Sequence, residues 1–409
     1  MIAALSLAML LLGGEAMPPT SPSSVARELF TLYDQFMQPD IRSRRFTQSQ
    51  MVAWLTPLCD SAVMKCSAAG QSAEGRAINL YSVGTGPVRV LLWSQMHGDE
   101  PTATMALVDL CRFLTIHREH PVASAIRTRL TLQLVPMLNP DGAERFTRRT
   151  AQMIDMNRDA LVLVAPESRI LKRLQEQYKP DYAFNLHDQD RHYTVGTSRK
   201  VTAIALLAPA TNDEKTDDVV RRRAKRVAAV LAGVLGEFVP GHVAKWDDTF
   251  EPRAFGDNVQ RWGTSTVLLE SGWWPDDPEK MFLRKLNCVG LLTALYSIAV
   301  GISETTDPAA YEAIPFNTKF LFDIIYRNAT LQMTASVAPV RVDVGVNVEE
   351  VRDDSTGAIR RMASIQDIGD LSVYSGLREF DMRGRRIEPS RIRLETPFSA
   401  EELASIFGN

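Results

Sequence analysis

Two of the six histidines in this 409-residue chain stand where the sequence predicts the end of a buried strand. His97 follows the apolar run Val88–Trp93, Glu100 comes next in a His-x-x-Glu spacing, and His187 ends the run Asp181–Leu186. A catalytic zinc ion takes about three protein ligands and keeps one position for water. Two imidazoles and a carboxylate are a ligand set suited to hydrolysis, so the sequence predicts a zinc site here.

The His-x-x-Glu spacing alone is a weak signal, because the chain holds six histidines and 49 acidic residues. An ordinary helix start with surface side chains is the alternative interpretation. Glu270 strengthens the interpretation as a zinc site. It ends the apolar run Ser265–Leu269, and a carboxylate at a buried strand end is unfavourable unless it is paired or takes part in chemistry. It would act as general base on a zinc-bound water, whose pKa the metal lowers to about 7; a salt bridge to an arginine is its alternative role.

The segment between the two histidines is rich in turn formers and arginines. Asn139-Pro140-Asp141-Gly142 predicts a turn. Further along lie Arg148, Arg149 and the stretch Asp155–Asp159, which contains Arg158. One arginine can bind a carboxylate in bidentate fashion, and another can stabilise the oxyanion of a tetrahedral intermediate.

Strand and helix patterns alternate along most of the chain. They predict an α/β fold with a mixed, mostly parallel twisted sheet and helices on both faces, in which sites form beyond the carboxyl ends of the strands. We expect a signal peptide or disordered leader over 1–24, a catalytic domain over 25–305, and over 306–409 a helix followed by a small β-rich appendage.

The charge of the chain and its N-terminal sequence indicate which kinds of partner and which cellular compartment to expect. A formal charge of −3 gives no basic footprint for nucleic acid. The apolar N-terminal run is too short for a membrane span and fits a secretory signal, although no Lys or Arg precedes Arg27. We therefore expect a periplasmic or secreted protein, with the cytoplasm as the alternative, and no later membrane span. Cys59 and Cys66 are able to bridge, whereas Cys111 and Cys288 fit apolar helical patterns.

The ordered motifs MHGDE, NPDG, DMNRD, NLHD and LLESG resemble those of the zinc carboxypeptidase family, the M14 metallopeptidases, over residues 70–300. The resemblance implies a zinc carboxypeptidase-like fold and one Zn²⁺ per chain, held by His97, Glu100 and His187. It implies that Glu270 is the base that later protonates the leaving amine. Asp155 matches a carboxylate that orients the first zinc histidine.

The resemblance also implies how a substrate is bound. Asn157 and Arg158 match an Asn-Arg pair that binds a free terminal carboxylate. Arg148 matches the arginine that polarises the scissile carbonyl, with Arg149 as a close rival because one residue of slippage exchanges them. Digestive members carry a mobile tyrosine before the glutamate, but residues 245–263 contain none. The same stretch should hold the floor of the side-chain pocket, for which Phe255 is a candidate beside Arg253 and Asp257.

Three functions remain open from the sequence. The first is a metallocarboxypeptidase acting on peptides with a free carboxylate. The second is a zinc-dependent amidase or deacylase. It would act on N-acyl amino acids, as aspartoacylase-like enzymes do, or on peptidoglycan-type peptides. The third is a binding protein on a peptidase fold. The NPDG motif favours the peptidase, and the presence of both zinc histidines and Glu270 argues against the binding protein. The oligomeric state is open.

Overall fold

The computed structural model describes residues 20–59, 61–352 and 359–408. The predicted leader, over 1–24, therefore falls mostly outside the described residues. The centre of the molecule is an eight-stranded sheet with the strand order β1-β2-β4-β3-β5-β9-β7-β8. The strands are β1 Met64–Gln71, β2 Ala77–Val83, β3 Val88–Ser94, β4 Leu130–Val135, β5 Tyr182–Asp188, β7 Ile204–Leu207, β8 Val243–Lys245 and β9 Ser265–Ser271.

The sheet is mixed and mostly parallel, as the alternating patterns predict. Strands β4, β3, β5 and β9 run parallel to one another, and β7 runs parallel to β8, whereas the pairs β1–β2, β2–β4 and β7–β9 are antiparallel. Side chains of a strand alternate between the two faces. In β3, Val90 and Leu92 pack into one hydrophobic cluster, whereas Leu91 and Trp93 pack into another. The sheet is therefore buried on both faces, which explains its nearly continuous apolar strands.

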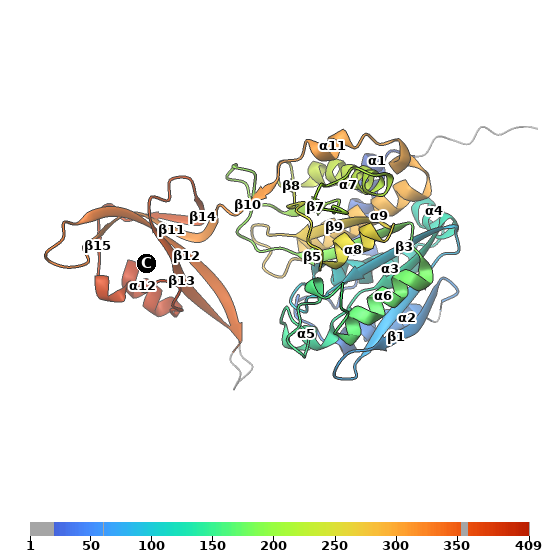
Figure 1. Ribbon diagram of the computed structural model, residues 1–409, viewed down its shortest axis with the longest axis horizontal. Helices are drawn as coiled ribbons and strands as arrows, with labels where there is room; N and C mark the ends of the chain where they lie inside the picture. The colour runs from blue at the N-terminus through green and yellow to red at the C-terminus, as the bar shows by residue number, and fades with distance from the viewer. Residues whose placement is uncertain (1–19, 60, 353–358, 409) are drawn as a thin grey trace, which may run out of the picture.

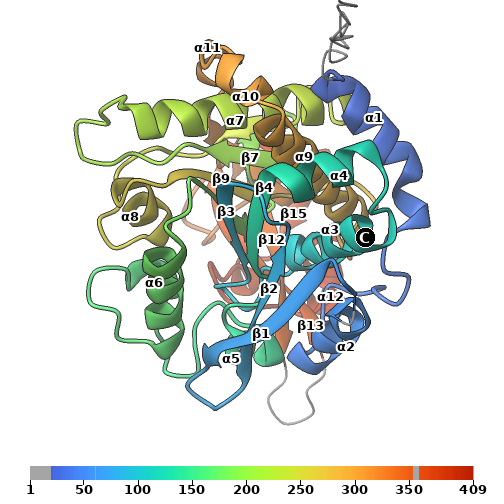
Figure 2. The same ribbon diagram turned by 90° about the vertical axis from the view of Figure 1, so that its right-hand side faces the viewer.

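Helices cover both faces, as Figure 2 shows. Residues of α1, α2, α3, α4, α7 and α9 join one cluster, and residues of α6 and α8 join the other. The helices are α1 Pro22–Leu32, α2 Gln48–Cys59, α3 Thr102–Ile116, α4 Pro121–Arg129, α5 Pro140–Arg145, α6 Pro166–Tyr178, α7 Val219–Phe238, α8 Phe255–Arg261, α9 Met281–Ala299, α10 Ile302–Thr305 and α11 Ala309–Glu312, with 3-10 turns η1 Tyr33–Gln35 and η2 Met156–Arg158.

Helix α9 corrects one expectation. Its 19 residues are long and apolar enough to cross a membrane, contrary to the prediction that no later segment is. However, 83% of its most apolar window is buried inside the protein, and it packs against α1, α3, α4 and α7. Its apolar composition on all sides is accounted for by its central place in the core.

A second sheet follows the catalytic fold, as the β-type runs predict. Its order is β13-β12-β11-β14, and the short β15 also pairs with β11. Helix α12 packs on it, with Phe407 stacked on Tyr326 at a centroid distance of 3.8 Å. The elements are β11 Leu321–Leu331, β12 Val340–Arg352, β13 Ile359–Gly369, β14 Ser375–Asp381, β15 Arg386–Ile387, η3 Pro389–Arg391 and α12 Ala400–Phe407. The proposed boundary at residue 305 coincides with the end of α10.

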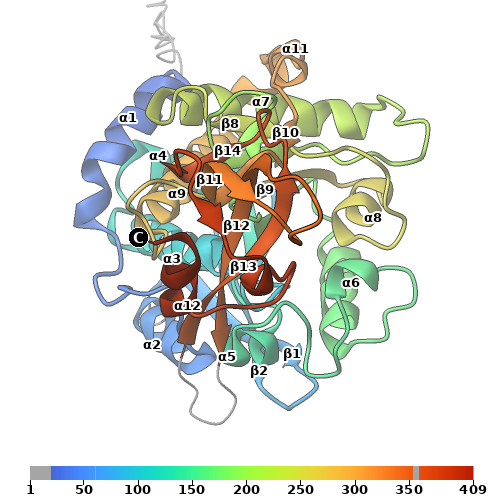
Figure 3. The ribbon, with the colours of Figure 1, turned by 90° about the vertical axis from the view of Figure 1, so that its left-hand side faces the viewer.

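The C-terminal sheet lies on one particular side of the catalytic fold. In Figure 1 it is beside α5, which follows the carboxyl end of β4, and opposite α4, which precedes β4. Figure 3, taken from that side, shows it in front of the central sheet. A small two-stranded sheet, β10 Asn317–Thr318 with β6 Thr194–Val195, ties the connecting segment to the catalytic fold. The appendage therefore stands near the strand ends where a site is expected.

The cysteines divide into a bonded pair and two buried thiols. Cys59 and Cys66 form a disulfide between the end of α2 and β1, with Cα atoms 5.6 Å apart. Cys111 and Cys288 are free and buried in the main core. Their place fits the prediction that they pack as small hydrophobes.

Candidate active site

His97, Glu100 and His187 converge at the carboxyl ends of β3 and β5. The Nδ1 atom of His97 lies 2.7 Å from one carboxylate oxygen of Glu100, and Nδ1 of His187 lies 2.7 Å from the other. One ligand atom from each residue lies within 4.8 Å of the others. All three side chains are buried. The structure thus brings together the residues predicted to hold a metal.

The loop that carries His97 and Glu100 is held in shape by the Asn139–Gly142 motif. Gly98 packs so closely on this motif that a Cβ atom would lie 2.0 Å from the carbonyl carbon of Gly142. Asn139 caps α5 by accepting from the Gly142 N–H, and its side-chain amide donates to the carbonyl of Met96. The predicted turn is therefore the start of α5 and the support for the loop.

Asp155 fixes the far side of the His97 ring. Its Oδ1 lies 3.1 Å from His97 Nε2 and accepts from the Asn157 N–H at 2.9 Å. Burial raises the pKa of Asp155, but hydrogen bonds from His97 and Arg148 outweigh it and hold the pKa below its usual range. A carboxylate on the outer nitrogen leaves Nδ1 directed at Glu100, which is how metal-binding histidines are oriented.

The structure separates the two adjacent arginines. Arg148 donates from Nε to Asp155, and its Nη1 lies 3.1 Å from His97 Nδ1 and 3.2 Å from Glu100 Oε1. Arg149 is exposed and donates to the carbonyl of Met153. Arg148 therefore lies against the cluster, whereas Arg149 points away from it.

The electrostatics of the cluster favour a positive charge between its ligands. Burial lowers the pKa of His97, but Glu100 and Asp155 outweigh it and raise the pKa to about 9. Burial raises the pKa of Glu100, yet the two histidines hold it well below its usual range. The Arg148 guanidinium already lies against two of the ligand atoms, as a cation would. Two imidazoles and a carboxylate also match the ligands of catalytic zinc, so the residues fit this metal.

Glu270 lies beside the cluster, opposite His187 in the pairing of β5 with β9. It is buried, and among the described residues its Oε2 has no hydrogen-bond partner. Burial, followed by the charge of Glu100, raises the pKa of Glu270 well above its usual value. An unpartnered buried carboxyl group costs free energy unless it has a task, so the salt bridge considered from the sequence is not its role here.

The predicted carboxylate-binding pair follows Asp155 on η2. Asn157 accepts the Phe255 N–H at 2.9 Å and thereby holds the start of α8. Arg158 donates to the carbonyl of Asn157, and its Nε lies 3.2 Å from a carboxylate oxygen of Glu251. The sequence analysis missed Glu251, because nothing in its pattern distinguishes it from a surface acid. Arg158 is therefore already paired with a carboxylate.

The residues predicted for the side-chain pocket differ in accessibility. Phe255 is 0% exposed and packs in the smaller hydrophobic cluster, in edge contact with Trp262. It contacts a substrate only if its surroundings move. Arg253 is exposed and pairs with Glu251 at 3.0 Å. Asp257 is 8% exposed, and burial raises its pKa to about 7.

Comparisons with known proteins agree with the motifs. Residues 51–185 match the family model described as zinc carboxypeptidase. A probable carboxypeptidase 2 of Trichophyton verrucosum is 26% identical over 162 residues, which are 39% of this chain and 30% of that protein. Carboxypeptidase 2 of Trichophyton rubrum is 25% identical over 161 residues, 39% of this chain and 29% of that protein. This chain thus matches about a third of the relatives' length.

The fold has counterparts among solved structures. A metallo-carboxypeptidase from Burkholderia cenocepacia superposes with a TM-score of 0.51 at 17% identity, covering 63% of this chain and 70% of that one. The likeness supports the predicted mixed sheet with helices on both faces. The family match over residues 51–185 confirms the resemblance drawn from the motifs.

Proposed function

We propose that the protein is a zinc metallocarboxypeptidase that hydrolyses the C-terminal peptide bond of its substrate. The observation that carries the proposal is the buried His97–Glu100–His187 cluster with the unpartnered carboxyl of Glu270 beside it. We further propose that one zinc ion binds per chain, on these three residues. A bound zinc ion supplies a Lewis acid and lowers the pKa of a coordinated water to about 7.

The chain's own residues account for the proton transfers. Glu270 takes a proton from the attacking water and delivers it to the departing nitrogen. Burial raises the pKa of Glu270 above its usual value, which is the direction that favours a carboxylate that takes up a proton and later returns it. Arg148 polarises the scissile carbonyl and stabilises the oxyanion, for which its guanidinium is already placed against the cluster.

Recognition of the free carboxylate falls to Asn157 and Arg158. A guanidinium binds a carboxylate in bidentate geometry, and Arg158 makes a contact of this chemical kind with Glu251. In this proposal the substrate carboxylate takes the place of Glu251 on Arg158. The family's mobile tyrosine has no equivalent in residues 245–263, so these residues carry the recognition without it.

A substrate panel tests the proposal. Peptides with a free C-terminal carboxylate, their C-terminal amides, N-acyl amino acids and a peptidoglycan-type stem peptide are each incubated with the zinc-loaded enzyme. We expect release of the last residue from free-carboxylate peptides only, abolished by a chelator and restored by zinc. Turnover of N-acyl amino acids without peptide turnover would instead indicate the amidase.

We also propose that the protein is exported, to the periplasm or beyond the cell. The Cys59–Cys66 disulfide supports this proposal, because such bonds persist in oxidising compartments and are rare in the cytosol. Cell fractionation with a cytosolic marker tests it. Recovery of the protein with the cytosolic marker and with reduced cysteines would contradict export.

A further inference from the structure

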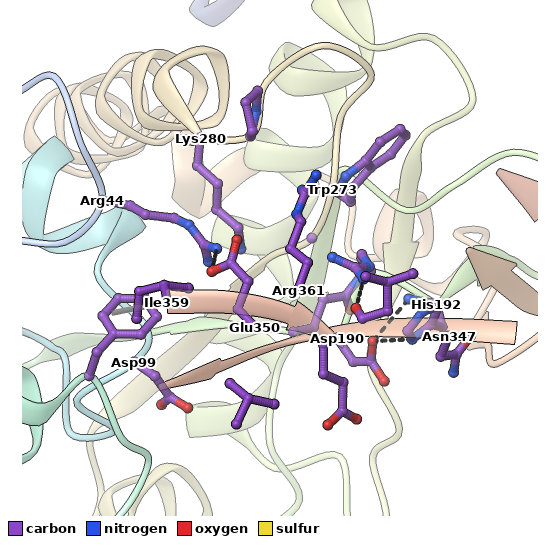
Figure 4. A pocket seen from close by; sticks show the side chains of 18 of the residues that line it. Arg44, Asp99, Asp190, His192, Trp273, Lys280, Asn347, Glu350, Ile359 and Arg361 are labelled. Carbon is purple, nitrogen blue, oxygen red and sulfur yellow. Dashed lines mark hydrogen bonds and ion pairs between the residues drawn. The ribbon is translucent and has the colours of Figure 1, made fainter. Parts of the chain in front are cut away.

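A cavity of about 990 Å³ lies between the catalytic fold and the C-terminal sheet. One side is formed by loops of the catalytic fold, including Gln189 and Trp273. The other side is formed by β12 and β13, including Glu350 and Arg361. Figure 4 labels Trp273, Glu350 and Arg361, and shows Arg361 rising from its strand toward Trp273. No role predicted from the sequence involves the residues of the C-terminal sheet.

The cavity reaches the edge of the catalytic cluster. Its lining includes Asp99, which lies between two zinc ligands in sequence, and Thr147, the neighbour of Arg148. It also includes Gly272, two residues beyond Glu270. The zinc ligands, Arg148 and Glu270 are themselves absent from the lining, as is the carboxylate-binding pair Asn157 and Arg158. A substrate whose terminal carboxylate lies at Arg158 and whose scissile carbonyl lies at the cluster therefore extends its acyl side into this cavity.

Ion pairs fix the sheet as a wall of the cavity. Arg191 of the catalytic fold lies 2.6 Å from Asp323 on β11. His192 lies between Asp190, at 2.6 Å, and Asp323, at 3.2 Å. Lys319 pairs with Asp190 at 2.8 Å. Pairs of partly buried groups with shared partners hold a fixed geometry better than isolated surface pairs do.

Arginines gather at the part of the wall built by β12 and β13. Arg44 and Arg45, from the loop before α2, both pair with Glu350, at 2.6 and 2.7 Å. Arg45 is further held over the Phe146 ring at 3.8 Å. Arg361 acts on the same carboxylate at longer range and lowers its pKa together with Arg44 and Arg45. Two guanidiniums therefore contact one carboxylate, and a third acts on it from a greater distance.

The balance of charge at this place is positive. Among the described residues, the carboxylates in contact with Arg44 or Arg45 are those of Glu350 and of Glu279, which accepts the backbone N–H of Arg44 at 2.8 Å. Arg361 is exposed, and within the described part of the chain its side chain makes no hydrogen bond or ion pair. Its five donors are therefore available to a ligand. A carboxylate is the group that matches a planar guanidinium in a positively charged place.

Resting on the proposed function, we propose that this cavity binds the acyl side of the substrate and that Arg361, with Arg44 and Arg45, binds a carboxylate there. The substrate class is a peptide with acidic residues upstream of the scissile bond. The C-terminal sheet is then part of the specificity machinery.

A matched pair of peptides tests the inference. Both end in the same two residues, and upstream one carries two glutamates where the other carries two glutamines. We expect the wild-type enzyme to prefer the glutamate peptide in kcat/KM by about tenfold, the size of one charge-assisted hydrogen bond. The preference should fall as salt rises from low to about 0.5 M, since exposed charges are screened.

Variants test whether the preference for the glutamate peptide arises from Arg361 on the β12–β13 side of the cavity. Arg361→Glu should bring the ratio of the two kcat/KM values to one or below, and Arg361→Gln should reduce it. Arg378→Glu, an exposed charge reversal on β14 outside the cavity lining, should leave the ratio unchanged. Turnover of both peptides with a ratio near one in the wild type contradicts this inference alone. An equal effect of Arg361→Glu and Arg378→Glu contradicts the role of Arg361. No turnover of any peptide by the zinc-loaded enzyme overturns the proposed function as well.

Discussion

Glu270 and His187 lie directly opposite each other where β9 pairs in parallel with β5. The strand register thus places the proposed base next to a proposed zinc ligand. A slip of β9 by one residue would turn Glu270 to the other face of the sheet, away from His187. The alignment of two strands that are distant in sequence is therefore a condition for the chemistry.

Replacement of Glu270 by glutamine should remove turnover but leave the metal site intact. We expect kcat to fall by about 10²–10⁴-fold or more, the usual contribution of a general acid–base group. Zinc content, measured by elemental analysis, should stay that of the wild type. Glu119→Gln, at an exposed carboxylate, serves as control. Near-normal kcat in Glu270→Gln would show that another group is the base.

Arg148 and Arg149 should differ sharply in their effect on catalysis. Arg148→Ala should lower kcat by about 10²–10³-fold, as loss of an oxyanion donor does. Arg149→Ala should change kcat little, because its side chain donates to the Met153 carbonyl outside the cluster. Steady-state kinetics of both variants on one peptide decide between them, and a larger loss in Arg149→Ala would reverse the assignment.

Arg158→Ala should selectively weaken the binding of peptides that have a free C-terminal carboxylate. We expect KM to rise for these peptides, while the low rate on the matching C-terminal amides stays unchanged. Glu251→Gln should act in the opposite direction and lower KM by up to about fivefold, since a partly exposed ion pair is worth about 1 kcal/mol at most. If Arg158→Ala impairs turnover of the C-terminal amide peptides as much as turnover of the free-carboxylate peptides, Arg158 does not bind the carboxylate.

Asp257 should make stability depend on pH. Burial raises its pKa to about 7, so between its usual pKa near 4 and pH 7 the folded protein keeps a proton that the unfolded chain releases. The free energy of unfolding therefore falls as pH rises through this window. Asp257→Asn, which can still accept the Glu251 N–H, should match the wild type at pH 4 and exceed it by a few kcal/mol at pH 8. Denaturant unfolding at both pH values measures this, and equal stabilities at pH 8 would contradict it.

The sequence was sufficient to predict the sheet and the convergence of His97, Glu100 and His187, because strand ends and short motifs are local signals. His97, Glu100, His187 and Glu270 each follow an apolar run that becomes a strand. Local sequence patterns do not show which of two adjacent residues of the same type has a given role. Only the fold shows that Arg148 lies at the cluster and Arg149 does not.

Other features depend on tertiary packing and were beyond the sequence. The local sequence pattern around an aromatic residue such as Phe255 is the same whether the residue forms the floor of a pocket or packs in a core. Here Phe255 lies in the core. Helix α9 passes a membrane-span test because a central core helix has the same composition. The approach of Arg361 to a cavity beside the cluster arises from the docking of strands β12 and β13, which lie more than 150 residues away from His187 along the chain.

We propose that one metal ion binds His97 and Glu100, from the loop after β3, and His187, at the end of β5. Zinc content of the purified wild type and of His187→Ala, measured by elemental analysis after dialysis against zinc-free buffer, tests it most directly. We predict one zinc ion per chain in the wild type and almost none in the variant, with both proteins folded by circular dichroism. The same zinc content in the two proteins would contradict the account.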